Sequence, residues 1–154
     1  MKNIKTVYMI GSMEFRTYQE LFYEHFYIRS RLASLGLKVI DPLLKERHSP
    51  NKQVTLTKCG IKPKTVYELD MKAVEVSEIL FWITGDIVSE GSITEIATGG
   101  AWNRWGKKPV KTIVIISPKR AKKEKVHFSN FHKGVKIFEK VDDGIEFIRR
   151  KYKL

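Results

Sequence analysis

Short, unbroken apolar runs constrain the fold of this 154-residue chain most strongly. After its first threonine, the run Thr112–Ile116 consists only of isoleucine and valine. A strand of this kind is typical of the centre of a parallel sheet, where helices cover both faces. Comparable runs predict strands at Thr6–Ile10, Leu37–Ile40 and Ile79–Ile83, and a short strand near Val135–Phe138.

Segments with a helical spacing of apolar residues separate these runs. They predict helices over Tyr18–Leu35, Val66–Val76 and Ser92–Trp105, and a last helix from Asp142 onward. The order of the elements predicts one α/β domain over residues 1–154. We expect a single flavodoxin-like domain with a five-stranded, mostly parallel sheet, strand order 2-1-3-4-5, and helices on both faces.

Local signals predict where some of these helices begin and end. Gly36 is expected to cap the first helix at its C-terminus. Thr65 and Glu68 have the spacing of a capping box, which predicts that the second helix begins after Thr65. The polar stretch from Pro42 to Lys64 is too long for an ordinary connection, so we expect a functional loop with short helical pieces.

The composition, with 42% hydrophobic and 30% charged residues, is that of a soluble globular protein. No apolar run is long enough to cross a bilayer, and the residues before the first strand lack the pattern of a signal peptide, so we expect no secretory leader. The single Cys59 cannot form an internal disulfide. The four histidines lack metal-ligand spacing, so we expect neither a metal site nor a cofactor. These features predict a cytoplasmic protein without membrane contact.

The net charge of +12 is unevenly distributed along the chain. Residues 1–101 hold 13 Lys and Arg against 12 Asp and Glu, which leaves 16 basic and 5 acidic residues after residue 101. This excess favours either a surface that attracts the phosphates of a nucleotide or nucleic acid, or a solvated lysine-rich region. The run Lys119–Lys125 has no aromatic residues for base stacking, so a nucleic acid is not the favoured partner.

Candidate site residues follow the strands, because sheets of this kind bind ligands beyond the carboxyl ends of their strands. Gly11 and Ser12 follow the first strand, Asp41 the second and Ser117 the fourth. The longest such segment, Thr84 to Glu95, follows the third strand.

The loop Ser89–Glu95 carries the most informative pattern. Gly91 would let the backbone approach a ligand closely, and Ser89 adds a hydroxyl group. The first amides of the next helix are unpaired donors at a positive dipole end, so they favour a phosphate or a sugar hydroxyl. Glu95 lies about one turn into that helix and can turn its carboxylate back to the site. A glutamate near a helix N-terminus is also favourable without any catalytic role.

Several motifs together resemble the nucleoside 2-deoxyribosyltransferase superfamily, which includes the 2′-deoxynucleoside 5′-phosphate N-hydrolases. The match covers most of the chain. The motifs are the first strand with Tyr8 and its Gly11-Ser12 turn, Asp70 on the second helix, the pattern Ser89-x-Gly91-x-x-x-Glu95, and the stretch Ile96–Val110 with its Gly-Lys-Lys-Pro-Val entry into the fourth strand.

The resemblance implies an enzyme that cleaves the N-glycosidic bond of a nucleoside or nucleotide. Glu95 would attack the anomeric carbon, and Tyr8 would hold its carboxylate by a hydrogen bond. Asp70 would bind or protonate the leaving base. Gly11, Ser12, Ser89, Gly91 and Ser92 would bind the substrate.

Two departures from the family pattern bear on the substrate. Glu78 stands where the family usually has an aspartate, which the fold should tolerate. Ser89 and Ser92 stand where transferases of the family carry aspartate, and a serine can donate a hydrogen bond to a 5′-phosphate that a carboxylate would repel. This difference favours hydrolysis of a 5′-monophosphate.

The resemblance also implies a homodimer or a higher oligomer. Ser129 and Asn130 precede the last strand, where family members place a polar residue that reaches the neighbouring subunit's site. Trp82, Trp102 and Trp105 are expected in the core or at a subunit interface rather than as base-stacking platforms.

Two alternatives stay open. The chain could be a deoxyribosyltransferase that exchanges bases between deoxynucleosides. It could instead be a non-catalytic nucleotide-binding or nucleic-acid-binding module. The joint presence of Tyr8, Asp70 and Glu95 favours an enzyme.

Overall fold

A parallel five-stranded sheet forms the centre of the protein in the computed structural model, which describes residues 4–11, 17–45, 63–84, 89–118 and 134–154. The strands are β1 (Thr6–Gly11), β2 (Lys38–Ile40), β3 (Ile79–Ile83), β4 (Thr112–Ile116) and β5 (Val135–Phe138). Their order is β2-β1-β3-β4-β5, and every neighbouring pair is parallel. The predicted fold class and strand order are confirmed.

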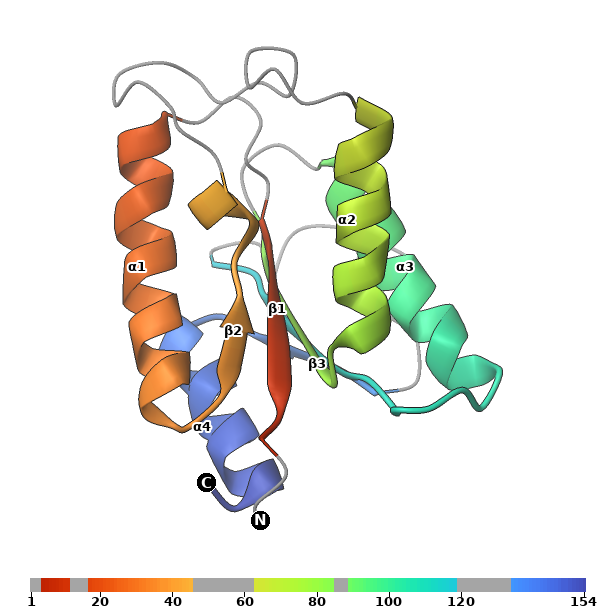
Figure 1. Ribbon diagram of the computed structural model, residues 1–154. Coiled ribbons are helices and arrows are strands. Elements are labelled where there is room, and N and C mark those ends of the chain that lie inside the picture. The colour runs from red at the N-terminus through yellow and green to blue at the C-terminus, as the bar shows by residue number, and fades with distance from the viewer. Residues whose placement is uncertain (1–3, 12–16, 46–62, 85–88, 119–133) are drawn as a thin grey trace.

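Helices cover both faces of this sheet (Figure 1). The helices are α1 (Tyr18–Ser34), α2 (Pro63–Val76), α3 (Glu90–Arg104) and α4 (Val141–Tyr152), with a short 3-10 helix η1 (Pro42–Lys45) after β2. α1 and α4 pack on one face, and α2 and α3 pack on the other.

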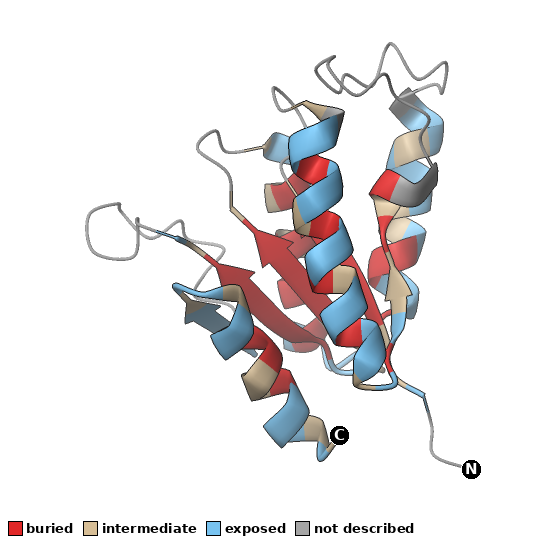
Figure 2. Ribbon diagram, turned by 90° about the vertical axis from the view of Figure 1, so that its left-hand side faces the viewer, coloured by how far each residue is buried: buried red, intermediate tan, exposed pale blue. Residues whose placement is uncertain are grey.

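Alternate residues of β1 belong to two separate apolar clusters. Val7 and Met9 pack with α1 and α4, whereas Tyr8 and Ile10 pack with α2 and α3. Because both faces are covered, every residue of β3 and β4 is buried, as Figure 2 shows in red. Full burial of an aliphatic side chain stabilises a fold by about 1.5–3 kcal/mol, so these two strands contribute heavily to its stability.

Two predicted helix starts are wrong. α2 begins at Pro63, so Thr65 lies inside the helix rather than at its N-cap, because proline is favoured in a first helical turn. α3 begins at Glu90 rather than Ser92, because the Ser89 side chain already caps the helix. Ser92 is therefore a residue of the first turn.

At the end of α1, Gly36 follows the C-cap Leu35 with a φ of +79°, and its N–H donates to the carbonyl of Ala33. This confirms Gly36 as the residue that ends the helix. The capping box of the fold lies at the start of α1 instead. Thr17 Oγ1 accepts from Glu20 N–H, and Glu20 Oε2 accepts from Thr17 N–H.

Lys111, just before β4, joins the far ends of two helices. Its buried Nζ donates to the carbonyls of Glu75 and Ser77 at the end of α2, at 2.6 and 2.7 Å. Its backbone exchanges two hydrogen bonds with the Asn103 side chain near the end of α3. Burial lowers the pKa of Lys111 to about 8. This lysine therefore ties α2 and α3 to β4 at the amino edge of the sheet.

Candidate active site

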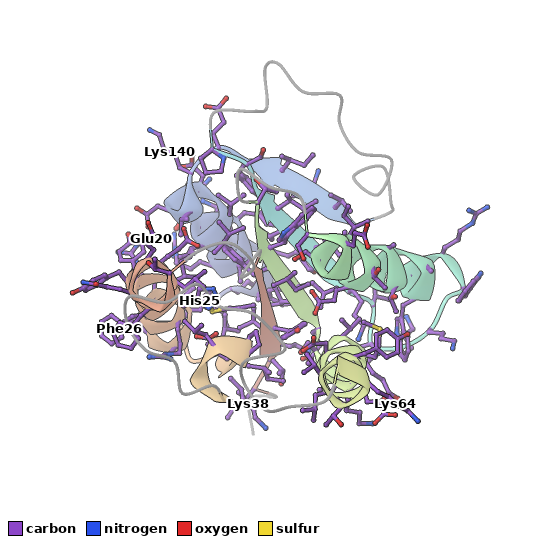
Figure 3. The ribbon with its side chains drawn as sticks, turned by 90° about the horizontal axis from the view of Figure 1, so that it is seen from above. Glu20, His25, Phe26, Lys38, Lys64 and Lys140 are labelled. Atoms are coloured by element: carbon purple, nitrogen blue, oxygen red, sulfur yellow. The ribbon has the colours of Figure 1, made fainter. Side chains whose placement is uncertain are left out.

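The carboxyl edge of the sheet carries the predicted site residues that the structure describes. β1 and β3 lie side by side at the centre of the sheet, and their last residues, Gly11 and Ile83, are paired. The chain leaves β1 toward α1 on one face, whereas α2 and α3 flank the other face. Figure 3 looks down on this edge from above. In parallel sheets, ligands bind in a crevice where the connections of two neighbouring strands lead to opposite faces of the sheet, as they do here at β1 and β3.

Three side chains from three elements meet at Tyr8. Its phenolic oxygen lies 2.7 Å from Glu95 Oε1 and 3.0 Å from Asp70 Oδ1. Tyr8 faces α2 and α3 because alternate strand residues face opposite sides of the sheet. Asp70 lies midway along α2, and Glu95 lies in the second turn of α3, beside the buried Ile96. The three residues chosen from the sequence as catalytic are therefore neighbours in space.

Burial controls the charge of this group. Glu95 is only 7% exposed, and this burial raises the pKa of its carboxyl group to about 8, with a further rise from the negative charge of Asp70. The hydrogen bond from Tyr8 acts in the opposite direction. Burial, followed by the charges of Glu95 and Asp70, raises the pKa of Tyr8 far above its ordinary value. Tyr8 therefore keeps its proton and remains a donor.

The single proton of Tyr8 allows two states of the group. Below about pH 8, Glu95 holds its own proton and can donate it to the Tyr8 oxygen, while Tyr8 donates to Asp70. Above this pH, Glu95 is a carboxylate and accepts from Tyr8. A buried carboxyl group that titrates near neutral pH is typical of a catalytic site, where it can act as nucleophile, base or acid.

The N-terminus of α3 forms the second part of the site. Ser89 is its N-cap, and Ser89 Oγ accepts from Ser92 N–H at 3.4 Å. A side chain at Gly91 would contact only Ser89 Oγ, at 3.6 Å, so packing among the described residues does not require glycine there. Ser92 is buried. The cap therefore uses the Ser92 amide, and binding of an anion by the other amides of the first turn stays a prediction.

Gly11 ends β1 beside a pair of buried side chains, of which the sequence analysis names Asp41 as a candidate but misses His25. His25 of α1 is 1% exposed, and its Nδ1 lies 2.8 Å from Asp41 Oδ1, just after β2. A Cβ added to Gly11 would lie 3.1 Å from His25 Nε2. The available signal was the position of His25 in the apolar stripe of α1, which contains Leu21, Ile28 and Leu32.

The remaining sequence predictions have different outcomes. Ser12, Ser129, Asn130 and Cys59 lie outside the described residues. Glu78 serves the amino edge of the sheet, where its carboxylate accepts from Thr6 N–H at 2.8 Å. Trp82 is buried in the core, as expected, whereas Trp105 is 71% exposed.

The described part of the chain holds neither a cluster of metal-binding side chains nor a membrane-spanning helix. It contains no group of three His, Cys, Asp or Glu side chains that could hold a metal ion. None of its helices combines the length and the apolar character that crossing a membrane requires.

Comparison with known proteins shows similarity in structure. No protein-family model and no curated protein matches the sequence. A conserved protein from Enterococcus faecalis matches with a TM-score of 0.65 and 13% identity over 96% of this chain and 99% of its own. The CMP N-glycosidase BcmB of Clostridium botulinum matches with a TM-score of 0.59 and 16% identity over 95% and 99%.

A 2-deoxyribosyltransferase from Bacillus psychrosaccharolyticus is similar to a comparable degree. Its TM-score is 0.62 at 17% identity, over 96% of this chain and 95% of its own. At these identities, the comparisons show that the chain shares the fold of this glycosidase and this transferase over nearly its full length. The resemblance stated from the sequence is thereby confirmed at the level of the fold.

Proposed function

We propose that this protein cleaves the N-glycosidic bond of a nucleoside 5′-monophosphate and releases the free base. The observation that carries the proposal is the contact between Tyr8 and Glu95, which holds a buried carboxyl group 2.7 Å from a phenol at the carboxyl edge of the sheet. The activities of the glycosidase and the transferase that share the fold support the same class of reaction.

The reaction would proceed in two displacements. A carboxylate oxygen of Glu95 attacks the anomeric carbon while the carbon–nitrogen bond breaks and its electron pair goes to the base. Asp70, 3.0 Å from the Tyr8 oxygen, binds the base or supplies the proton that the leaving nitrogen takes up. Water then attacks the same carbon and displaces Glu95, so the sugar gains a hydroxyl group and Asp70 takes up the remaining proton of the water.

The charge of Glu95 suits the first displacement. A carboxylate with little water around it is poorly stabilised before the reaction, which is why burial raises its pKa to about 8. The positive charge that develops at the anomeric carbon then provides the missing stabilisation in the transition state. Tyr8 orients the carboxylate by its hydrogen bond.

The N-terminus of α3 would bind the 5′-phosphate. The Ser89 hydroxyl accepts from Ser92 N–H and keeps its own proton for a phosphate oxygen. The amides of the first turn and the helix dipole add to the attraction. A serine at this position, rather than the aspartate of the transferases, favours the phosphorylated substrate.

The oligomer and the location remain predictions. We propose a homodimer or larger assembly in the cytoplasm, in which Ser129 and Asn130 of a neighbouring subunit complete each site. Light scattering that shows a monomer at working concentration would contradict this assembly.

Incubation with a panel of nucleosides and nucleoside 5′-monophosphates, with and without a second base, tests the reaction. Chromatography should show free base and sugar phosphate as products. A second base should neither increase the rate of the reaction nor yield a new nucleotide. Glu95→Gln should lower turnover by several orders of magnitude, whereas the same change at the exposed Glu75 should not.

Other products would identify the alternatives. Formation of a new nucleoside from the second base would replace the hydrolase by a transferase. Tight binding of nucleotide or salt-sensitive binding of DNA, without any release of base, would show a non-catalytic binding module.

A further inference from the structure

A histidine–aspartate pair lies at the same edge of the sheet and has no part in the reaction described above. His25 comes from α1 and Asp41 follows β2, sixteen residues later, and both are at least 97% buried. Asp41 Oδ1 also accepts from Leu43 N–H at 3.0 Å, and Asp41 Oδ2 lies 3.4 Å from Arg29 Nη1. With these three partners, the Asp41 carboxyl group is fixed in place, and its Oδ1 can accept a hydrogen bond donated by His25 Nδ1.

The other ring nitrogen of His25 is unusual. Nε2 is buried, and no hydrogen-bond partner for it exists among the residues that the structure describes. A buried polar atom without a partner is unfavourable, so such atoms are rare unless a ligand or water completes their hydrogen bonds. The Asp41–His25 arrangement is also the one by which proteins fix an imidazole ring for work at its second nitrogen.

The position of Nε2 relates it to the candidate active site. It faces Gly11, the last residue of β1, where an added Cβ would lie 3.1 Å away. Gly11 is three residues beyond Tyr8 on the same strand, or roughly 10 Å at the rise of an extended chain. Figure 3 shows His25 on the side of α1 that faces the sheet, whereas Phe26 points away from it. Tyr8 and His25 therefore flank the end of β1 from opposite faces.

We propose that His25 Nε2 binds a second oxygen of the 5′-phosphate that the N-terminus of α3 also holds, with Asp41 as the positioning residue that orients the ring. This inference rests on the proposed function, because it assumes a phosphorylated substrate. Glu95 would hold the sugar at its anomeric carbon on one face of β1, and the imidazole would hold the opposite end of the sugar phosphate beyond Gly11. The ring donates from Nε2 when both of its nitrogens carry protons, and Asp41 and the phosphate then bear the compensating charges.

Nitrogen-15 NMR on the wild-type protein tests the contact without requiring turnover. The probes are ribose 5-phosphate and 2-deoxyribose 5-phosphate, each compared with the sugar that lacks the phosphate. The phosphorylated sugars should move the Nε2 resonance of His25 toward that of a protonated ring nitrogen, and the plain sugars should not. The spectrum of His25→Gln assigns the resonance.

Calorimetry on variants gives the strength of the contact. His25→Phe should bind the sugar phosphates at least about tenfold more weakly than the wild type, with little change for the plain sugars. His25→Gln keeps an amide donor, so its affinity for the sugar phosphates should lie between those of His25→Phe and the wild type. Asp41→Asn should weaken binding in the same direction, whereas the same change at the exposed Asp143 should leave it unaltered.

An Nε2 resonance that does not respond to the sugar phosphates would overturn the proposal, as would variants that bind them as tightly as the wild type. The two proposals can fail separately. A responding resonance in a protein that releases no base from any substrate would retain the phosphate contact and remove the reaction. Release of base together with an Nε2 resonance that does not respond would retain the reaction and remove the phosphate contact of His25.

Discussion

Tyr8→Phe is the substitution that most directly tests the proposed chemistry. It removes the hydroxyl group and keeps the ring that fills the apolar cluster beneath α2 and α3. The lost hydrogen bond is the one that opposes the effect of burial on Glu95, so the pKa of Glu95 should rise above its value of about 8. A hydrogen bond to a charged group contributes about 1.5–3 kcal/mol, and 1.36 kcal/mol corresponds to one pKa unit. The expected rise is therefore about one to two units.

The direction in which kcat/KM changes with pH follows from the charge that Glu95 must carry to act as a nucleophile. A nucleophilic carboxylate acts when it is deprotonated, so kcat/KM of the wild type should increase with pH and level off above about pH 8. In Tyr8→Phe, this increase should move to higher pH. At pH 7 the variant should lose about tenfold to a hundredfold through ionisation alone, and part of that loss should disappear at high pH.

The assay is kcat/KM for the best monophosphate between pH 6 and pH 10 at constant ionic strength. Tyr27→Phe serves as the control, because the Tyr27 hydroxyl donates to Asp142 at the surface and not to the site. A uniform loss with no shift along the pH axis would show that Tyr8 does not act through the ionisation of Glu95. Wild-type activity that falls as the pH rises through 8 would indicate that Glu95 works as an acid.

Three further substitutions have defined outcomes. The free energy of unfolding of Glu95→Gln should increase relative to that of the wild type as the pH rises from 5 to 8.5, by at most about 5 kcal/mol in urea unfolding. The reason is that folding raises the pKa of Glu95 from 4.5 to about 8, so the wild type loses stability over this range. A difference in unfolding free energy that does not change with pH would refute the argument that Glu95 carries a buried charge. Ser89→Asn and Ser89→Asp should both retain the helix cap, but only the aspartate should reverse a preference for monophosphates over nucleosides. If the two variants show the same substrate preference, Ser89 does not bind the phosphate. Gly91→Ala should keep the melting temperature within a few degrees, because the added methyl group has space. It should raise KM at least about tenfold, because the methyl group would block the approach of substrate to this backbone. An unchanged KM would show that the substrate binds elsewhere.

Much of the fold could be predicted because its signals are local. The unbroken run Thr112–Ile116 could be stable only between two layers of helices, and its position in the sheet follows from short right-handed connections. The family-like motifs predict Tyr8, Asp70 and Glu95 as catalytic residues, and the structure adds the distances between them and the burial of Glu95.

The missed features depend on contacts between elements or on competing local signals. Ser89 and Ser92 both suit an N-cap, and only the hydrogen bond between them decides for Ser89. Thr65 has the pattern of a capping box, but Pro63 starts the helix first. His25 and Asp41 belong to separate elements, so their pairing follows from how α1 packs beside the end of β2. No spacing rule in the sequence indicates it.

Lys111 makes the candidate active site sensitive to substitutions at the opposite edge of the sheet. The same residue anchors α2, which carries Asp70, and α3, which carries Glu95, through four hydrogen bonds at the amino edge of the sheet. In a random mutational screen for the proposed activity, substitutions at position 111 should therefore lower activity, although Lys111 lies at the edge of the sheet opposite the candidate active site. In a redesign of substrate preference, residue 111 should be held constant while Ser89 and Gly91 are varied, because the library would otherwise change the spacing of the two carboxylates together with the specificity.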